Sequence, residues 1–218
     1  MSLTGKKILI LLGGIWHDFE GFTKAVTPLL EAEDCIVEAT YDLDCLKQLD
    51  QMGVDILLSY TCLGKHREGY NDTGPEYMTD EQVKGLRDWV QSGGALLAAH
   101  AATVIADSDP SLGDLMGGVF VSHPPQFAFT VYPMYGEHPI TEGIEAFTVH
   151  DEFYIERLVG PVDVHMAAVD RGTAYPMVWS KREGQGRVAH VAMGHSELVW
   201  DLPLYRKLML QALGWLVQ

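Results

Sequence analysis

The sequence predicts an α/β fold built on a mostly parallel sheet, with extra antiparallel strands in its second half. Three apolar runs, at 6–12, 54–60 and 95–99, are short and continuous, as is typical of strands buried on both faces. Helical stretches separate these runs, and such an alternation indicates β–α–β units. After residue 118 the pattern changes to shorter strands and hairpins, which indicates antiparallel pairing.

The first half contains clear start and stop signals. Thr79 and Gln82 have the spacing of a capping box, and Gly93 is a helix stop. The polar loop at 61–78 has a length that is often associated with function in compact α/β domains. The expected elements are a strand at 6–12, a helix at 20–33, a strand at 35–40, a short helix at 44–52, a strand at 54–60, a helix at 79–94 and a strand at 95–99, followed by a tight turn at His100 and then a helix.

The second half is expected to add strands to the same domain. The segment 182–187, "REGQGR", has the composition of a turn between two strands. A helix is expected to begin at Pro203, because proline is favoured in a first helical turn. The expected strands lie within 119–123, 127–132, 147–154, 162–169 and 175–193. With no repeat and no linker, residues 1–218 are predicted to form one domain.

Composition excludes several classes of function. The chain has 218 residues and a formal charge of −15, which disfavours nucleic-acid binding. No apolar run approaches the roughly 20 residues of a membrane helix, so we expect no membrane partner. The three widely spaced cysteines do not suggest a disulfide framework or a thiolate zinc site. We therefore expect reduced thiols in a cytoplasmic protein.

Polar residues follow several predicted strands at the point where each strand ends. Open parallel sheets bind ligands beyond the carboxyl ends of their strands, so these residues are candidates for one site. His100 and His195 are the strongest, because small residues beside them allow a ligand to approach closely. The other candidates in these positions are His17, His123, Asp151 and Glu152.

Each weaker candidate has a structural alternative. His17 could begin a helix, and His123 could begin a turn at the following prolines. The Asp151–Glu152 pair could be an exposed pair, whereas His138, His165 and His190 have the patterns of turn or strand residues. The sequence holds no GxGxxG, P-loop or HExxH motif.

The motifs together resemble a known family. They are "GGIWHD" at 13–18, "GGALLAAHAAT" at 93–103, "HPITEGI" at 138–144, "DEFY" at 151–154, and "GRVAHVAMGHS" at 186–196 followed by "YRKLMLQALGWL". From about residue 6 to 217 the chain resembles the trehalose-utilisation, or ThuA-like, family. The resemblance implies a class I glutamine amidotransferase-like fold, a three-layer sandwich with a flavodoxin-like sheet.

The resemblance also indicates what the site has lost. In amidotransferases of this fold the turn after the strand carries a nucleophilic cysteine, and a later His-x-Glu completes the triad. Here His195 and Glu197 match that His-x-Glu, but His100 stands where the cysteine is expected. Thioester chemistry needs an ionisable thiol, so we predict that the protein is not a glutaminase.

The family is linked to the use of trehalose and related disaccharides through 3-keto sugars, and some members resemble metal-binding proteins. We therefore expect a small-molecule sugar or keto-sugar as the partner, with metal-assisted proton transfer or isomerisation. Imidazoles with a carboxylate suit a divalent metal ion, most of all zinc. The predicted catalytic residues are His100, His195 and Glu152; the predicted metal ligands are His100, His123 and His195; the predicted substrate contacts are Trp16, His17, Asp151 and Tyr154.

Other interpretations remain open at this level. The aromatic residues could belong to the core. The protein could be a non-catalytic sugar-binding or regulatory protein, or a metal-dependent hydrolase. The sequence does not determine the oligomeric state, and a homo-oligomer is one of the possibilities.

Overall fold

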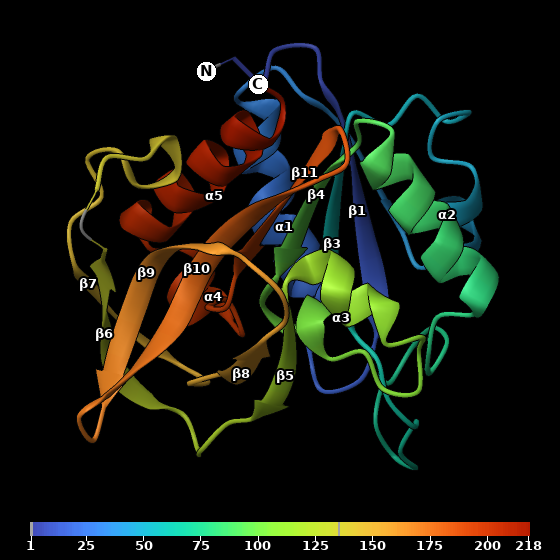
Figure 1. Ribbon diagram of the computed structural model, residues 1–218. Helices are drawn as coiled ribbons and strands as arrows, with labels where there is room; N and C mark the ends of the chain where they lie inside the picture. The colour runs from blue at the N-terminus through green and yellow to red at the C-terminus, as the bar shows by residue number, and fades with distance from the viewer. Residues whose placement is uncertain (1, 135) are drawn as a thin grey trace.

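The computed structural model describes residues 2–134 and 136–218 and shows a large sheet with helices on both faces (Figure 1). Nine strands of the described residues form this sheet, in the order β2-β1-β3-β4-β11-β10-β9-β6-β7. The first five strands in that order are parallel, and each later strand is antiparallel to its neighbour. The order of the parallel strands is the flavodoxin-like one, so the predicted fold class is confirmed.

The parallel half is buried on both faces in its four inner strands, whereas the edge strand β2 is largely exposed. Its strands are β2 (Ile36–Thr40), β1 (Lys7–Gly14), β3 (Ile56–Cys62), β4 (Ala95–Ala99) and β11 (Gly186–Val191). Successive residues of a strand point to opposite faces, and accordingly Ile10 packs into one hydrophobic core while Leu11 packs into the other. Two cores, one on each face, explain why β1, β3 and β4 are continuous apolar runs.

Helices supply the other wall of each core. One face is covered by α1 (Phe19–Glu31), α4 (Glu197–Trp200) and α5 (Pro203–Leu216), and the other by α2 (Asp80–Gln91) and α3 (Ser111–Met116). The predicted capping box is present: the Thr79 hydroxyl accepts from the Gln82 N–H, and the Gln82 side chain accepts from the Thr79 N–H. The predicted start of the last helix at Pro203 is also confirmed.

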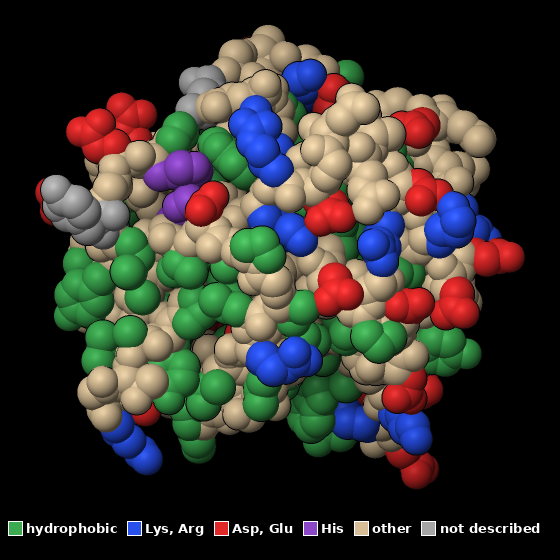
Figure 2. All heavy atoms as spheres, viewed as in Figure 1, with side chains coloured by type: hydrophobic (Ala, Val, Ile, Leu, Met, Phe, Trp, Pro, Cys, Tyr) green, Lys and Arg blue, Asp and Glu red, His purple; other side chains and the backbone are tan. Residues whose placement is uncertain are grey.

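The antiparallel half extends the sheet beyond β11. Its strands are β10 (Thr173–Glu183), β9 (Asp163–Asp170), β6 (Phe127–Pro133) and β7 (Phe147–Asp151), and a separate two-stranded sheet pairs β5 (Gly118–Ser122) with β8 (Ile155–Leu158). In the view of Figure 2, hydrophobic side chains gather over this half, on the left, while charged side chains are frequent over the parallel half. Tyr132 of β6 and Val169 of β9 are exposed apolar residues of this half.

Three segments differ from their predicted structure. After β4 the chain forms a 3-10 helix over His100–Thr103 (η2), and the next α-helix is α3, which starts directly after Pro110. The helix expected at 44–52 is a 3-10 helix over Leu43–Lys47 (η1). The strand expected at 147–154 ends at Asp151 as β7, and the next strand, β8, begins only at Ile155.

Among the described residues, no helix combines the length and apolar character needed to cross a membrane.

Candidate metal centre

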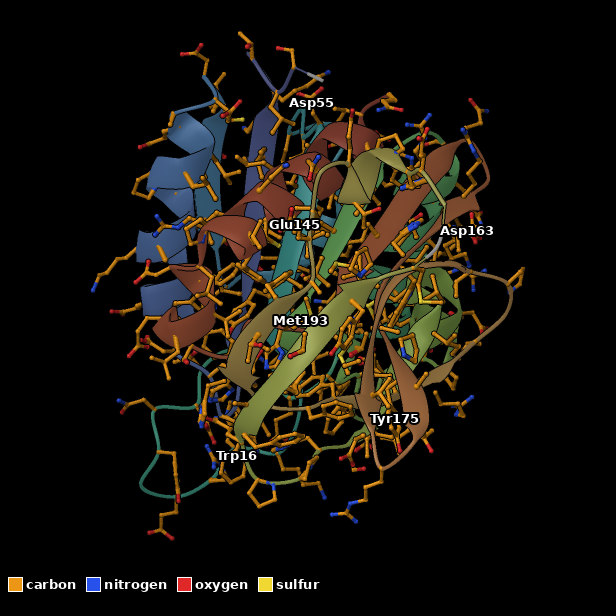
Figure 3. The ribbon with its side chains drawn as sticks, turned by 90° about the vertical axis from the view of Figure 1, so that its left-hand side faces the viewer. Trp16, Asp55, Glu145, Asp163, Tyr175 and Met193 are labelled. Carbon is orange, nitrogen blue, oxygen red and sulfur yellow. The ribbon has the colours of Figure 1, made fainter. Side chains whose placement is uncertain are left out.

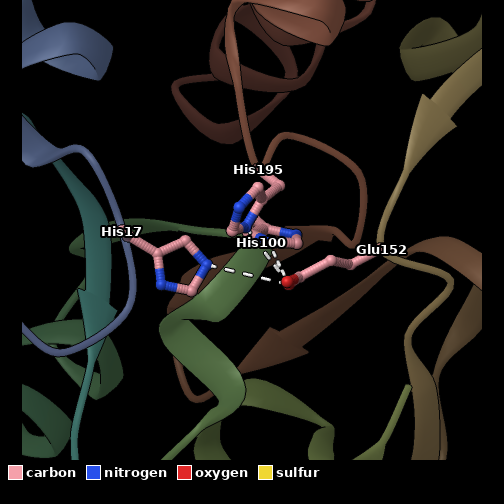
Figure 4. A group of neighbouring side chains, drawn as sticks. All are labelled: His17, His100, Glu152 and His195. Atoms are coloured by element: carbon pink, nitrogen blue, oxygen red, sulfur yellow. Dashed lines mark ion pairs between the residues drawn. The ribbon is translucent and has the colours of Figure 1, made fainter. Parts of the chain in front are cut away.

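Four side chains from four different segments meet at one edge of the sheet (Figure 4). His17 follows β1, His100 follows β4 and His195 follows β11, and these parallel strands all end at this edge. Glu152 follows β7, which runs in the same direction as β11 because three antiparallel partners lie between them. We name His17, His100, Glu152 and His195 the four-residue centre.

One oxygen of Glu152 lies at the middle of the centre. Glu152 Oε2 is 3.2 Å from Nδ1 of His195 and 3.4 Å from Nε2 of His100. The distance to Nε2 of His17 is 4.0 Å, and one donor atom from each of the four residues lies within 4.8 Å of the others. This spacing places three imidazole nitrogens around a single carboxylate oxygen.

Backbone carbonyls determine which ring nitrogen faces the centre. Nδ1 of His17 donates to the carbonyl of Ile15 at 3.0 Å, and Nδ1 of His100 donates to the carbonyl of Ala192 at 2.6 Å. A carbonyl only accepts hydrogen bonds, so in the neutral rings the proton is on Nδ1 and the lone pair is on Nε2. This arrangement, with the second nitrogen held by an outer partner, is typical of metal-ligating histidines.

The nitrogens that face the centre have no hydrogen-bond partner. Nε2 of His17, Nε2 of His100 and Nδ1 of His195 are all buried, and none makes a well-oriented hydrogen bond, although all three lie within 4.0 Å of Glu152 Oε2. Buried polar atoms are rarely left without a partner, and a bound ion is one of the few explanations. The residues present therefore fit a divalent cation.

His100 occupies the predicted apex position in an unusual backbone conformation. Its φ is +45°, in the left-handed region that non-glycine residues rarely adopt. Ala99 and Ala101 on either side are fully buried, and the ring of Tyr154 stacks on the imidazole at 4.2 Å. The strained turn projects the imidazole out of the end of β4 into the centre.

The charges of the centre suit a cation. Burial opposes the charged form of Glu152, but His100 and His195 hold the pKa of its carboxyl well below its usual range. Burial and the nearby charges of His100 and His195 lower the pKa of His17 to about 3. Burial also acts against the charged form of His100, yet its contacts with Glu152, Asp151 and the Ala192 carbonyl raise its pKa. Near neutral pH the centre thus offers a carboxylate and at least one neutral imidazole.

The turn that carries His195 is held from several sides. The carboxylate of Asp151 accepts the N–H groups of Gly194, at 2.7 Å, and His195, at 3.1 Å. The Gly194 carbonyl accepts from the hydroxyl of Tyr60 at 2.9 Å and from the indole N–H of Trp200 at 2.5 Å. Both oxygens of Asp151 therefore bind backbone, a role that differs from the substrate contact that we predict for this residue.

A cavity of about 490 Å³ opens above the centre. His123 lies at this cavity outside the centre, with Nε2 at 3.7 Å from Oε1 of Glu152 and its side chain 35% exposed. We predict His100, His123 and His195 as metal ligands. The four-residue centre contains His100 and His195, but it contains His17 in place of His123. The cavity is lined by Ile15, Trp16, His17, Cys62, Val104, Phe120, His123, Glu152, Tyr154 and His195.

Aromatic side chains form the walls of the cavity. Trp16 is 59% exposed, and Figure 3 places it at the end of the molecule opposite Asp55, the residue before β3. The guanidinium of Arg67 lies 3.1 Å from the ring centre of Trp16 and 3.7 Å from that of Tyr70. Tyr154 is buried in the opposite wall.

Several of these contacts escape the sequence interpretation. Arg67 and Tyr70 lie in the loop at 61–78, whose length predicts function but whose fold does not follow from its composition. Phe120 and Val104 are ordinary apolar residues with no signal of a cavity. Glu197 begins α4 and is exposed, and no contact between it and His195 occurs among the described residues.

Comparisons with known proteins agree with this architecture. A family model described as trehalose utilisation, ThuA, matches residues 7–216. A ThuA-like protein from Parabacteroides merdae is similar with a TM-score of 0.77 and 18% identity, over 99% of this chain and 91% of that one. A cytoplasmic protein from Salmonella typhimurium LT2 has a TM-score of 0.70 and 14% identity, over 97% of this chain and 100% of that one.

The fold also occurs within a larger protein. For a β-galactosidase from Rahnella sp. R3 the TM-score is 0.67 at 14% identity, and 96% of this chain corresponds to 31% of that chain. No curated protein matches the chain. These structural likenesses concern the fold alone, whereas the family model spans almost the whole sequence. The chain therefore belongs to the ThuA, or trehalose-utilisation, family.

Proposed function

We propose that the chain is an enzyme that binds a divalent metal ion at the four-residue centre and acts on the carbonyl group of a sugar or keto-sugar. The observation that carries this proposal is the set of three buried imidazole nitrogens that surround one oxygen of Glu152 without a well-oriented hydrogen bond. Histidine nitrogens with a carboxylate oxygen suit zinc best among the common divalent ions. A zinc ion bound there would act as a Lewis acid toward the substrate carbonyl.

His123 is placed to move a proton. Its Nδ1 donates to the carbonyl of Pro124 at 2.8 Å, so in the neutral ring Nε2 is free to accept a proton on the side of Glu152. Because the side chain is partly exposed at the cavity, it can exchange protons with solvent. We infer that His123 takes the proton from the hydroxyl-bearing carbon beside the carbonyl and returns it to the carbonyl carbon. The proton of that hydroxyl moves to the former carbonyl oxygen, so that the carbonyl group shifts by one carbon, which is an isomerisation.

The cavity supports a sugar as the substrate. Its volume lies within the usual range for small-molecule sites. Trp16 and Tyr154 offer flat apolar rings, and the centre offers polar groups at the base. The description of the family, trehalose utilisation, points to the same class of substrate.

Thioester chemistry is not part of this proposal. His100 stands at the apex of the turn, and Cys62 is the thiol that reaches the cavity. Burial and the charge of Glu152 raise the pKa of the Cys62 thiol to about 12, so it stays protonated at neutral pH. We therefore expect no release of ammonia from glutamine.

The setting of this function is also a proposal. The shared sheet supports residues 1–218 acting as one domain. Three buried, unpaired cysteines and the cytoplasmic relative from Salmonella support a cytoplasmic location.

The test combines metal analysis with proton exchange. We expect about one zinc ion per chain, and we expect deuterium from D₂O to enter a 3-keto-glucoside beside its carbonyl. A cleaved glycosidic bond without exchange would indicate the metal-dependent hydrolase instead, and saturable binding without either reaction would indicate a sugar-binding protein. Absence of both bound metal and sugar binding would refute the proposal.

A further inference from the structure

A second buried polar cluster lies beside the four-residue centre. It consists of Thr103, Glu156 and His190, whose side chains are fully or almost fully buried. Oε2 of Glu156 is 3.2 Å from Nε2 of His190, and the hydroxyl of Thr103 donates to Oε1 of Glu156. One carboxylate thus contacts both other members of the cluster.

Each member belongs to a segment that also carries a residue of the centre. Thr103 ends η2, the 3-10 helix that begins with His100. Glu156 lies on β8, four residues after Glu152. His190 lies on β11, five residues before His195. The two contacts of Glu156 therefore join the three segments that hold His100, Glu152 and His195.

The cluster does not reach the substrate cavity. None of its three residues is among those that line the cavity. The ring of Trp179 covers His190 at 4.2 Å, and its indole N–H donates to the carbonyl of Met116 at 2.9 Å. The cluster is consequently closed off from the cavity, and the three segments that it joins link it to the centre.

Stability alone does not explain a buried carboxylate at this position. Removing a charged pair from water is costly, and well-packed apolar side chains are often as stable in its place. A polar cluster does fix one arrangement of the segments that it joins. The hydroxyl of Thr103 also lies 3.5 Å from the carbonyl oxygen of His100, whose backbone has the strained φ of +45°.

We propose that Glu156 is a positioning residue: through Thr103 and His190 it sets the relative placement of the metal-binding side chains. This inference rests on the proposed function, because it assigns the cluster to the same centre. Its loss is expected to weaken metal binding without removing any ligand. Outer partners of this kind typically change metal affinity by about 10- to 100-fold.

The test compares three variants with a matched control. Thr103→Val removes the hydroxyl contact, and Glu156→Gln removes the carboxylate charge and one of its two acceptor oxygens, whereas Thr103→Ser keeps the hydroxyl. The control is Ser180→Ala, because Ser180 is equally buried and its hydroxyl contacts Nε2 of His165 at 2.7 Å, away from the centre. The measurements are zinc affinity by competition with a chelator, the visible spectrum of the Co²⁺-loaded protein, and the melting temperature.

We expect Thr103→Val and Glu156→Gln to bind zinc at least about 10-fold more weakly and to alter the Co²⁺ spectrum. Thr103→Ser should keep the wild-type affinity, and Ser180→Ala should lower the melting temperature alone. If folded Thr103→Val has the zinc affinity and the Co²⁺ spectrum of the wild type, the inference is overturned. Because Thr103→Val removes only one hydroxyl, it tests the inference even if Glu156→Gln does not fold.

Failure of the proposed function gives a different result. Should the wild-type protein bind no metal, crystal structures of the metal-free wild type and Thr103→Val still decide the inference. A displaced His100 ring, no longer 3.4 Å from Oε2 of Glu152, supports positioning by the cluster. An unchanged ring position in the variant refutes it.

Discussion

Histidines in the two halves of the sheet, with buried or half-buried side chains, differ in what their ring nitrogens contact. At the end of the parallel strands, His17 and His100 each donate from Nδ1 to a carbonyl and keep Nε2 unpaired. In the antiparallel half, His165 and His138 stack at 3.9 Å. There Nε2 of His165 bonds to the hydroxyl of Ser180, and Nδ1 of His138 accepts a backbone N–H. The first pair is open toward a ligand and the second is satisfied within the fold.

This difference teaches that burial alone does not mark a functional histidine. His165 and His100 are both buried on a predicted strand or at its end. What separates them is a free lone pair that points at a shared carboxylate.

The largest effect is expected from His100→Ala. It removes one of three nitrogens around Glu152, so zinc affinity should fall by more than about 100-fold, beyond the usual effect of an outer partner. Isothermal titration of the metal-free protein with zinc measures this loss. In the antiparallel half, His165→Ala should lower stability and leave zinc affinity unchanged. Equal losses of zinc binding in both variants would contradict the comparison.

Much of the parallel half could be predicted from local patterns. The strand at 95–99 has the predicted bounds, and the capping box at Thr79 starts α2 as expected. A strand buried on both faces is a continuous apolar run, and a capped helix has signals at its own ends. The turn after β4 differs, since the energetic balance between a 3-10 turn and an α-helix depends on packing around His100.

The next effect concerns the backbone that brings His17 to the centre. A Cβ at Gly14, where φ is +116°, would lie 1.9 Å from the carbonyl oxygen of Cys62. Gly14→Ala should therefore cost roughly 4 kcal/mol of unfolding free energy or more. Its counterpart is Gly172, in the turn between β9 and β10, where φ is +80° and no atom lies within 4 Å of the added Cβ.

For Gly172→Ala only the backbone conformation is strained, so we expect a loss of about 1–2 kcal/mol. Urea denaturation at neutral pH measures both variants. A smaller loss for Gly14→Ala than for Gly172→Ala would show that the chain at the end of β1 can move aside, and would weaken the case for a rigid centre.

The site could be predicted in part. The strand-end rule correctly places His100 and His195 at one edge, since it depends only on the direction of parallel strands. The rule also lists Glu152 as a strand-end residue, but it does not show that β7 ends at the same edge, because that depends on four antiparallel pairings between β11 and β7. The rule also gives no reason to prefer His17 over His123 as a metal ligand. In the structure His17 belongs to the centre, because its Nδ1 bonds to the Ile15 carbonyl and its Nε2 faces Glu152. The structural interpretation of His165 as a packed strand residue matches its place in β9.

Asp151 connects the two halves, and its substitution should have an intermediate effect. In Asp151→Asn the side chain keeps one acceptor oxygen, while its NH₂ group faces an N–H of the turn at Gly194 and His195. Lost hydrogen bonds to a charged group predict a decrease of about 2 kcal/mol in unfolding free energy. Zinc affinity should fall by about 10-fold, because the turn carries His195.

Asp170→Asn provides the control, since Asp170 ends β9 and its carboxylate contacts only exposed Arg171 among the ion pairs of the described residues. Thermal melting and zinc titration should both detect Asp151→Asn and leave Asp170→Asn near the wild type. Unchanged zinc affinity in Asp151→Asn would mean that the turn keeps its position without the carboxylate.

The smallest effect concerns the satisfied histidines. Burial and the nearby His138 lower the pKa of His165 to about 4, against an ordinary value of 6.5. The folded protein thus keeps His165 neutral at a pH where the unfolded chain already takes up a proton. Acid therefore favours unfolding: the stabilising contribution is complete above pH 6.5 and is lost as the pH falls from 6.5 toward 4.

His165→Gln removes this titration and can retain a side-chain hydrogen bond to Ser180. Between pH 7 and pH 5.5, the wild type should lose about 1 kcal/mol more unfolding free energy than the variant. Urea denaturation at the two pH values measures the difference, and the titration of the four-residue centre cancels because both proteins contain it. If the unfolding free energies of the wild type and His165→Gln change equally with pH, the folded protein does not keep the ring of His165 neutral. Only the four-residue centre would then support the difference between the two groups of histidines.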